Sequence, residues 1–257
     1  MKCEFKNAKK IHDIIKFVSL FEDYVNLDCT KEGISLFSMS NCHTVFIDIK
    51  LPVEYFADYK CDEPCKIGLN FTVLLNALGS SKAKDSLMME CPNVGDSVVF
   101  TKMGDGVNTQ YTIKQIEIEH TDELTIPEME ENFTCKISPS FLKTWKRDIV
   151  DFTGAELKIV PTTKLLCLSS DGDSGMVSLK QQVPSIGIEY LHYDEPDGIT
   201  LSNKNISKVF GDIGKVSNTI ELGNRNDMPF RIGATLDDGG SLRVFVAPCI
   251  EGGMDED

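Results

Sequence analysis

The chain has 257 residues and a formal net charge of -14 at pH 7, with 41% hydrophobic and 26% charged residues. This composition is ordinary for one large or two smaller folded domains, and since no run of about 18 apolar residues occurs, it excludes a helix that spans a membrane. A net charge of this size and sign, taken alone, argues against binding to nucleic acid.

Nine cysteines, an odd number, are scattered along the chain. They form no paired framework, so we expect reduced thiols and a location inside the cell. The N-terminal residues lack the uninterrupted apolar run of a secretory signal. Only Cys61 and Cys65, in "CDEPC", lie close together, and no second pair or nearby histidine completes a zinc site. We therefore expect no metal and no cofactor.

Residues 6–18, "KNAKKIHDIIKFV", are the first predicted helix. Apolar side chains recur at positions i, i+3, i+4 and i+7 of an amphipathic helix, at Ile11, Ile14, Ile15 and Val18. The opposite side is basic, with Lys9 and Lys16 at its centre and Lys10 on its flank. One face of this helix should pack against the protein and the other should carry positive charge.

Three further segments, 70–84, 138–150 and 203–217, are predicted helices of the same kind. In the second of the three, Phe141, Trp145 and Ile149 make the apolar stripe. Basic side chains lie on the other faces or just beyond the helix: Lys82, Lys84, Lys143, Lys146, Arg147, Lys204, Lys208 and Lys215. The segment 70–84 is mostly apolar and is the weakest of the four.

The positive charge is concentrated in these helices. Residues 6–16, 70–84, 139–148 and 203–215 hold 12 basic and 3 acidic side chains, or +9, which leaves (26 - 12) - (40 - 3) = -23 for the other 208 residues. Lysines are common on any single solvated helix, but four biased helices in an acidic chain favour a polyanion bound along them. Few aromatic residues interrupt the lysines and no recognition helix is evident, so we predict contact with the backbone of duplex DNA without sequence preference.

Between the helices the sequence is rich in short alternating segments, many of them bounded by turn signals such as "GDG", "DGDSG" and "DDGG". The predicted strand segments are 25–29, 33–40, 44–51, 86–91, 97–103, 110–116, 134–138, 156–160, 165–170, 176–183, 218–222, 229–236 and 241–248. This pattern predicts an α+β protein made mostly of antiparallel sheet. The order of the parts repeats after about 130 residues, so we predict two similar domains with two basic helices each, 1–115 and 134–257, the second ending in a short acidic tail.

Residues 116–133, between the predicted domains, contain seven acidic residues and no lysine or arginine. We expect an extended connector on the surface. Leu124, Ile126 and Pro127 form an apolar cluster at its middle. These residues either offer a docking edge for peptides or only fix the connector to the domains.

Four segments together resemble the proliferating cell nuclear antigen family of eukaryotic-type DNA sliding clamps: "GISLFSMSNCHTVFIDIKL", "FADYKCDEPCKIGLNFTVLLNAL", "LTIPEMEENF" and "LRVFVAPCIE". Their order and spacing follow the family through nearly the whole chain. The resemblance implies a homotrimeric ring that encircles duplex DNA, with helices lining the hole and sheets outside. The resemblance also implies that the ring confers processivity on DNA polymerase. The DNA-facing residues would be Lys9, Lys10, Lys16, Lys82, Lys84, Lys143, Lys146, Arg147, Lys204, Lys208 and Lys215.

In this family a pocket beneath the connector receives short peptide motifs of DNA polymerases, flap endonucleases, ligases and the clamp loader. The matching positions here are Met39, His43, Val45, Leu124, Ile126, Pro229, Phe245, Ala247 and Pro248. The connector is slightly longer than the family pattern between its proline and Phe133. Ring closure would pair residues 108–116, with Tyr111 and Ile113, with residues 175–183 of the next subunit, with Met176 and Ser178.

Two other classes of protein are alternatives. No phosphate-binding loop, nucleophile elbow or HExxH motif is present, so we do not expect an enzyme. The other alternative is a monomeric processivity factor or one subunit of a heterotrimeric checkpoint clamp. The family implies a nuclear location, or a viral replication site if the chain is encoded by a virus.

Overall fold

The computed structural model describes residues 1–118 and 130–249. Their contacts group into two units. Unit 1 comprises residues 1–118 together with 234–244, and unit 2 comprises residues 130–233 together with 245–249. A short segment of the C-terminal half therefore belongs with the first unit, which a division by sequence position alone does not anticipate. Among the described residues, no helix is long and apolar enough to cross a membrane.

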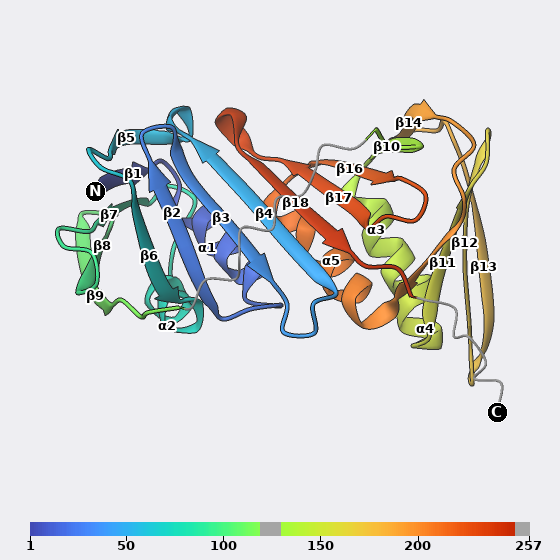
Figure 1. Ribbon diagram of the computed structural model, residues 1–257, viewed down its shortest axis with the longest axis horizontal. Helices are drawn as coiled ribbons and strands as arrows, with labels where there is room; N and C mark the ends of the chain where they lie inside the picture. The colour runs from blue at the N-terminus through green and yellow to red at the C-terminus, as the bar shows by residue number, and fades with distance from the viewer. Residues whose placement is uncertain (119–129, 250–257) are drawn as a thin grey trace. The chain divides into compact units, whose positions relative to one another are not determined.

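Unit 1 begins with a strand and a helix and continues with two further groups of strands separated by a second helix (Figure 1). Its elements are β1 (Lys2–Phe5), α1 (Ala8–Val18), β2 (Tyr24–Thr30), β3 (Gly33–Met39), β4 (Val45–Pro52), the 3-10 turn η1 (Val53–Tyr55), β5 (Phe56–Lys60), β6 (Cys65–Asn70), α2 (Phe71–Leu78), β7 (Ser86–Glu90), β8 (Ser97–Gly104) and β9 (Val107–Lys114).

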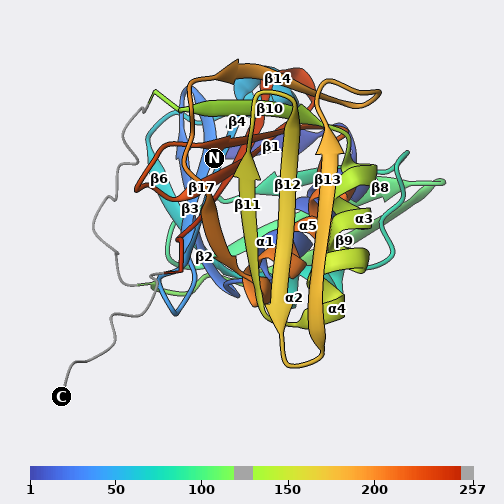
Figure 2. The same cartoon turned by 90° about the vertical axis from the view of Figure 1, so that its right-hand side faces the viewer.

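The second half of the chain follows the same order. Its elements are β10 (Phe133–Ile137), α3 (Pro139–Trp145), the π-helical segment η2 (Lys146–Val150), α4 (Asp151–Thr153), β11 (Glu156–Pro161), β12 (Leu165–Gly172), β13 (Gly175–Gln182), β14 (Ile188–Tyr193), β15 (Ile199–Ser202), α5 (Asn203–Val216), β16 (Thr219–Asn224), β17 (Phe230–Thr235), the 3-10 turn η3 (Asp237–Gly239) and β18 (Ser241–Val246). Figure 2 shows β11, β12 and β13 side by side.

The sheets repeat as well as the element order. Unit 1 contains a sheet of order β5-β1-β7-β8-β9, and unit 2 contains the run β14-β10-β16-β17. The order β4-β3-β2-β6 of unit 1 corresponds to β13-β12-β11-β15 of unit 2. In unit 1 this second sheet continues from β4 to β18, where Arg243 donates a hydrogen bond of 2.9 Å to Asp48. The predicted α+β class, with two similar antiparallel halves, is confirmed.

Local sequence explains where the helices begin. Asn7 caps α1 by accepting a hydrogen bond from the Lys10 N–H at 3.1 Å, and Asn70 caps α2 from the Val73 N–H at 3.2 Å. The predicted apolar stripe of α1 is buried, as is that of α5 at Ile206, Val209, Phe210 and Ile213. Burial of one face leaves the lysine-bearing face of each helix in solvent.

The helix predicted over 138–150 contains a segment that its sequence did not indicate. Its apolar stripe repeats every four residues, at Phe141, Trp145 and Ile149, whereas a regular α-helix turns once in about 3.6 residues. The π-helical bonds of η2 take up this difference, and both Ile149 and Val150 are buried. The helix ends at Gly154, whose φ of 67° is the left-handed conformation that glycine adopts without strain.

Five strands lie outside the predicted strand segments: β1, β5, β6, β14 and β15. Four of them, all except β1, stand at the outer end of a strand order and have a single neighbour. An outer strand is covered less completely than a central one, so its sequence alternates less clearly between apolar and polar residues.

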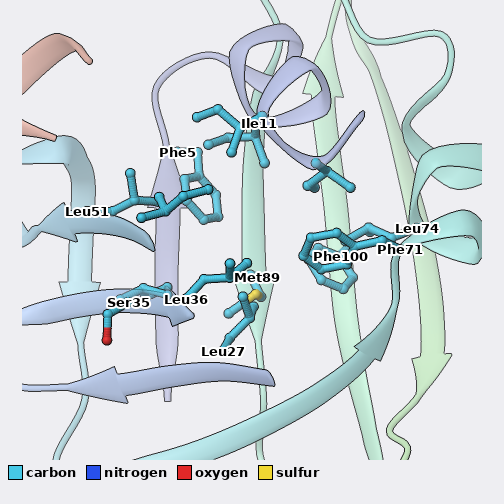
Figure 3. A pocket seen from close by; sticks show the side chains of 14 residues that line it. Phe5, Ile11, Leu27, Ser35, Leu36, Leu51, Phe71, Leu74, Met89 and Phe100 are labelled. Atoms are coloured by element: carbon cyan, nitrogen blue, oxygen red, sulfur yellow. The ribbon is translucent and has the colours of Figure 1, made fainter. Parts of the chain in front are cut away.

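The core of unit 1 lies where α1, α2 and the two sheets meet (Figure 3). Phe5, Ile11, Leu36 and Phe100 line a small apolar cavity of about 50 Å³ there. Its lining is almost wholly hydrocarbon, and its volume is about that of one or two water molecules. We therefore assign this cavity to core packing and place the functional surfaces elsewhere.

Candidate functional site

The basic face of α1 is partly neutralised by the protein's own acids. Lys9 forms an ion pair with Asp13 one turn further along the helix, and Lys10 pairs with Asp237 of η3. Lys16 is exposed and has no ion pair within the described part of the chain. The three lysines predicted to face DNA are therefore not equivalent.

Lys82 and Lys84 follow α2, as predicted, in a loop directed to the β8–β9 turn. Both ammonium groups bind Asp105, with Lys82 Nζ 2.9 Å from its carboxylate oxygen. The hydrogen bonds from Lys84 and then Lys82 lower the pKa of the Asp105 carboxyl below its ordinary value. Asp105 and Gly106 have φ angles of 51° and 75°, the left-handed pair of a tight type I′ hairpin turn. The hairpin thus presents the acid to both lysines.

In unit 2, Lys146 is held by contacts at its ammonium group and along the adjacent methylene groups. Its Nζ donates hydrogen bonds of 2.7 and 2.6 Å to the two carboxylate oxygens of Asp151. Its methylene chain lies against α5, where a Cβ atom on Gly211 would be only 3.3 Å from Lys146 Cε. Arg147 pairs with its neighbour Asp148 at 2.6 Å. Lys143, one turn earlier, is exposed and has no ion pair among the residues that the structure describes.

Along α5 the three lysines also differ. Lys204 is exposed near the start of the helix, Lys208 is half-buried, and Lys215 pairs with Asp212. No ion pair is found for Lys204 within residues 1–118 and 130–249. The positive face of α5 is therefore strongest toward its N-terminal end.

Acids that the sequence alone does not assign to this surface reduce its charge. Lysines of the four predicted segments pair with four acids from outside those segments: Asp105, Asp151, Asp237 and Asp238. Counting them changes the local charge from +9 to 9 - 4 = +5 per chain. The i,i+4 spacing of Lys9 and Asp13 and the i,i+3 spacing of Asp212 and Lys215 could be found in the sequence. The pairs made across turns and strands could not.

The two predicted interface strands are outer strands. In the strand orders of the described residues, β9 and β13 each have one neighbour. Met176 is 70% exposed and Ser178 is also exposed, Tyr111 is half-buried, and Ile113 is 7% exposed. Ile113 therefore faces the core, and only its backbone is available for pairing along this edge.

The residues matched to the peptide pocket are distributed over both units. In unit 1, Met39 and His43 line a hollow of about 260 Å³ together with Tyr24 and Ile118. Val45 is fully buried there and supports the loop without presenting a surface. Leu124 and Ile126 lie outside the described residues.

The remaining matched positions belong to unit 2. Pro229, Ala247 and Pro248 are half-buried, and Phe245 is 4% exposed. Pro248 forms a β-bridge with Leu201, which fixes the segment that follows β18. Phe245, like Val45, is buried, so the half-buried Ala247 and Pro248 that follow it are the positions accessible to a peptide.

The loop that carries His43 also contains the exposed thiol of Cys42. The Ser40 hydroxyl oxygen accepts hydrogen bonds from the N–H groups of Thr44 and Val45, at 3.3 and 3.1 Å, so its own proton is free to point at Cys42 Sγ, 3.5 Å away. Hydrogen bonds from Ser40 and then Thr44 lower the pKa of Cys42 to about 7. Elsewhere in the described chain, no group of three histidine, cysteine or acidic residues could hold a metal ion.

Known proteins resemble this chain along nearly its full length. The family model described as proliferating cell nuclear antigen, N-terminal domain, matches residues 1–124. A protein named proliferating cell nuclear antigen from Chaetomium thermophilum is 29% identical, over 94% of each chain. These comparisons support a clamp of the proliferating cell nuclear antigen type. A protein named DNA polymerase sliding clamp 1 from Thermococcus kodakarensis is 28% identical, over 96% of this chain and 97% of its own.

A solved structure of a protein named proliferating cellular nuclear antigen has the same fold as the chain. The crystal structure of proliferating cellular nuclear antigen from Entamoeba histolytica superposes with a TM-score of 0.89 at 18% identity, covering 97% of this chain and 98% of that one. The predicted resemblance to the proliferating cell nuclear antigen family is thus confirmed by the sequence comparisons, and the fold by the structural one. The roles of individual residues remain predictions.

Proposed function

We propose that this chain is a DNA sliding clamp that holds DNA polymerase on duplex DNA. The observation that carries this proposal is the placement of positive charge: in a chain of net charge -14, lysines gather on the solvent faces of helices in both units. Exposed lysines suit phosphate contacts that carry no sequence information. Such contacts fade within about 8–10 Å at working salt, which lets the protein move along the duplex.

The fold itself suggests how copies of the chain assemble. By element order β18 is the counterpart of β9, and β4 is the counterpart of β13. Within unit 1, β18 lies beside β4, whereas β9 and β13 have unused edges in the described sheets. We infer that β9 of one copy pairs with β13 of the next. A head-to-tail contact of this kind closes a ring after a fixed number of copies, here three, and covers the exposed edges.

Light scattering after size-exclusion chromatography tests the assembly. A mass near 3 × 28.6 = 85.8 kDa supports the trimer. Loading onto circular duplex DNA, followed by linearisation, then tests encirclement, since a closed ring should leave only through a free end. A stable monomer at micromolar concentration would instead support the alternative of a monomeric processivity factor or of a clamp that closes with different subunits.

We propose further that the hollow at Met39 and His43, with Leu124 and Ile126 of the connector, receives short peptide motifs of polymerases, the clamp loader, flap endonucleases and ligases. Its lining is mixed: Met39 and Ile118 offer apolar surface for an aliphatic or aromatic anchor, and polar side chains such as Asn41 lie beside them. Replacing Met39 and Ile126 with alanine should weaken binding of such a peptide in calorimetry while the oligomer persists. Unchanged affinity would place the pocket elsewhere. A nuclear site of action follows for a cellular clamp, and a viral replication site for a viral one.

A further inference from the structure

Three pairs of lysines provide an internal comparison on the basic helices. In each pair one lysine is bound to an acid of the same unit, and the other has no ion pair among the described residues. We call Lys9, Lys146 and Lys215 the tethered lysines, and Lys16, Lys143 and Lys204 the untethered lysines. The acids that bind the tethered lysines are Asp13, Asp151 and Asp212, and we call them the tether carboxylates.

The members of two of the three pairs are closely matched in direction. Lys9 and Lys16 are seven residues apart on α1, and Lys204 and Lys215 are eleven apart on α5. At about 100° per residue these separations return each lysine to within about 20° of its partner's direction. Lys143 and Lys146 are three residues apart in the α3–η2 helix, which leaves about 60° between their directions. On α1 and α5, proximity to an acid, more than orientation, therefore distinguishes the two sets.

The tether carboxylates are built into the helices. Asp13 has a side-chain exposure of 13% and also lies 3.2 Å from His12 Nδ1. Asp151 binds Lys146 through both oxygens and accepts a longer contact of 3.4 Å from Ser207 of α5. Asp212 has a side-chain exposure of 23%. Because these acids are partly ordered by their surroundings, each presents a fixed alternative partner to its lysine.

A tethered lysine that binds a phosphate either leaves its carboxylate or brings the phosphate close to that negative charge, so its net gain is smaller than that of an unpaired ammonium group. An untethered lysine exchanges only water and counterions. We propose that Asp13, Asp151 and Asp212 compete with DNA phosphates for the tethered lysines, so that the clamp grips the duplex mainly through Lys16, Lys143 and Lys204. This inference rests on the proposed clamp function and concerns regulation of the same surface.

Competition of this kind suits a protein that must slide. When a phosphate moves away, the ammonium group of a tethered lysine returns to an acid within reach and is not left unpaired. The rise in energy between successive phosphate positions is then smaller, and the barrier to movement is lower. Removing the tether carboxylates should make binding tighter and sliding slower.

The first test compares two triple variants that remove the same number of charges from the same helices. One is Lys16→Ala with Lys143→Ala and Lys204→Ala, and the other is Lys9→Ala with Lys146→Ala and Lys215→Ala. Lys208 is kept in both. The Kd for a short fluorescent duplex should rise more in the untethered variant, by roughly twofold to fivefold per lysine pair, the range of exposed ion pairs. Equal losses, or a greater loss in the tethered variant, would overturn the proposal.

The second test leaves every lysine in place, because Lys146→Ala also removes packing over Gly211. The variant Asp13→Asn with Asp151→Asn and Asp212→Asn should bind the duplex more tightly and diffuse more slowly along it. Its control changes three exposed loop acids by the same charge: Asp62→Asn, Glu63→Gln and Asp96→Asn. If the control tightens binding as much, the effect is one of net charge and the proposal fails.

The two levels of hypothesis fail differently. If the unmodified protein is not retained on circular duplex DNA, the proposed clamp function fails. If it is retained but the paired lysine variants behave alike, only the role of the tether carboxylates fails. Thermal unfolding of each variant checks that the helices remain folded.

Discussion

Helices α2 and α5 occupy the same place in the two repeats but have diverged on their solvent faces. Both bury an apolar stripe, Phe71, Leu74 and Leu78 in α2 and Ile206, Val209, Phe210 and Ile213 in α5. Their solvent faces differ: α2 shows uncharged Thr72, Val73 and Asn76, whereas α5 carries two exposed lysines and the half-buried Lys208. Packing against two sheets constrains the buried face, and the solvent face is free to acquire or lose charge.

The largest effect is expected on the shared, buried face. Phe210 is fully buried and its ring centroid is 6.3 Å from that of Trp145. Phe210→Ala should lower the free energy of unfolding by about 3–5 kcal/mol, since it removes a large side chain from a close-packed core. Urea unfolding measures the change. Val73→Ala on the exposed face of α2 is the control, and a comparable loss there would contradict the division into two faces.

The next largest effect is expected on the affinity for duplex DNA. Changing Lys204, Lys208 and Lys215 of α5 to alanine should weaken duplex binding more than changing Lys82 and Lys84, because both of the latter are bound to Asp105. The slope of log K against log salt should fall by about 0.9 for each phosphate that the variant no longer neutralises. If the α5 variant has wild-type affinity and salt dependence, these lysines do not face DNA.

A smaller effect should follow from releasing Lys82 and Lys84, which follow α2, from Asp105. Asp105→Asn keeps the hairpin, because asparagine tolerates the positive φ at this position, and frees Lys82 and Lys84. Duplex affinity should rise by a few-fold at most.

In the native protein, the lowered pKa of Asp105 means that its ion pairs with Lys82 and Lys84 contribute stability above the ordinary carboxyl pKa. This stability is lost as pH falls through the lowered value. An NMR titration of the carboxyl carbon should show this; a midpoint at or above the ordinary value would contradict it.

The smallest effect concerns the reactivity of a cysteine that only one of two corresponding turns contains. The β3–β4 turn of unit 1 contains Cys42, whereas the β12–β13 turn of unit 2 contains Asp173 and no cysteine. With a pKa of about 7, Cys42 should react with iodoacetamide at a rate that rises through pH 7, earlier than an ordinary thiol. Cys135, whose pKa burial raises to about 12, is the internal control. A midpoint near the ordinary thiol value of about 8.5 for Cys42 would mean that Ser40 does not stabilise the thiolate.

Several features of the site could be predicted without coordinates. The four helices, most central strands and the concentration of lysines follow from periodicity, since burial of one face imposes a spacing on the apolar residues. Outer strands such as β5 and β14 could not be predicted in this way, because their sequences alternate less clearly than those of β9 and β13, which also have a single neighbour. The wide spacing of Phe141, Trp145 and Ile149 was visible, but its accommodation by η2 was not.

The class of fold, the duplication and the family can all be read from the amino-acid sequence, because they depend on patterns repeated over many residues. The pairing of the lysines with acids cannot, since it is established when the chain folds. Asp105 meets Lys82 and Lys84 across a hairpin, and Asp237 meets Lys10 from the far end of the chain. Coulomb energy depends on distance in space, and folding sets that distance independently of separation along the chain.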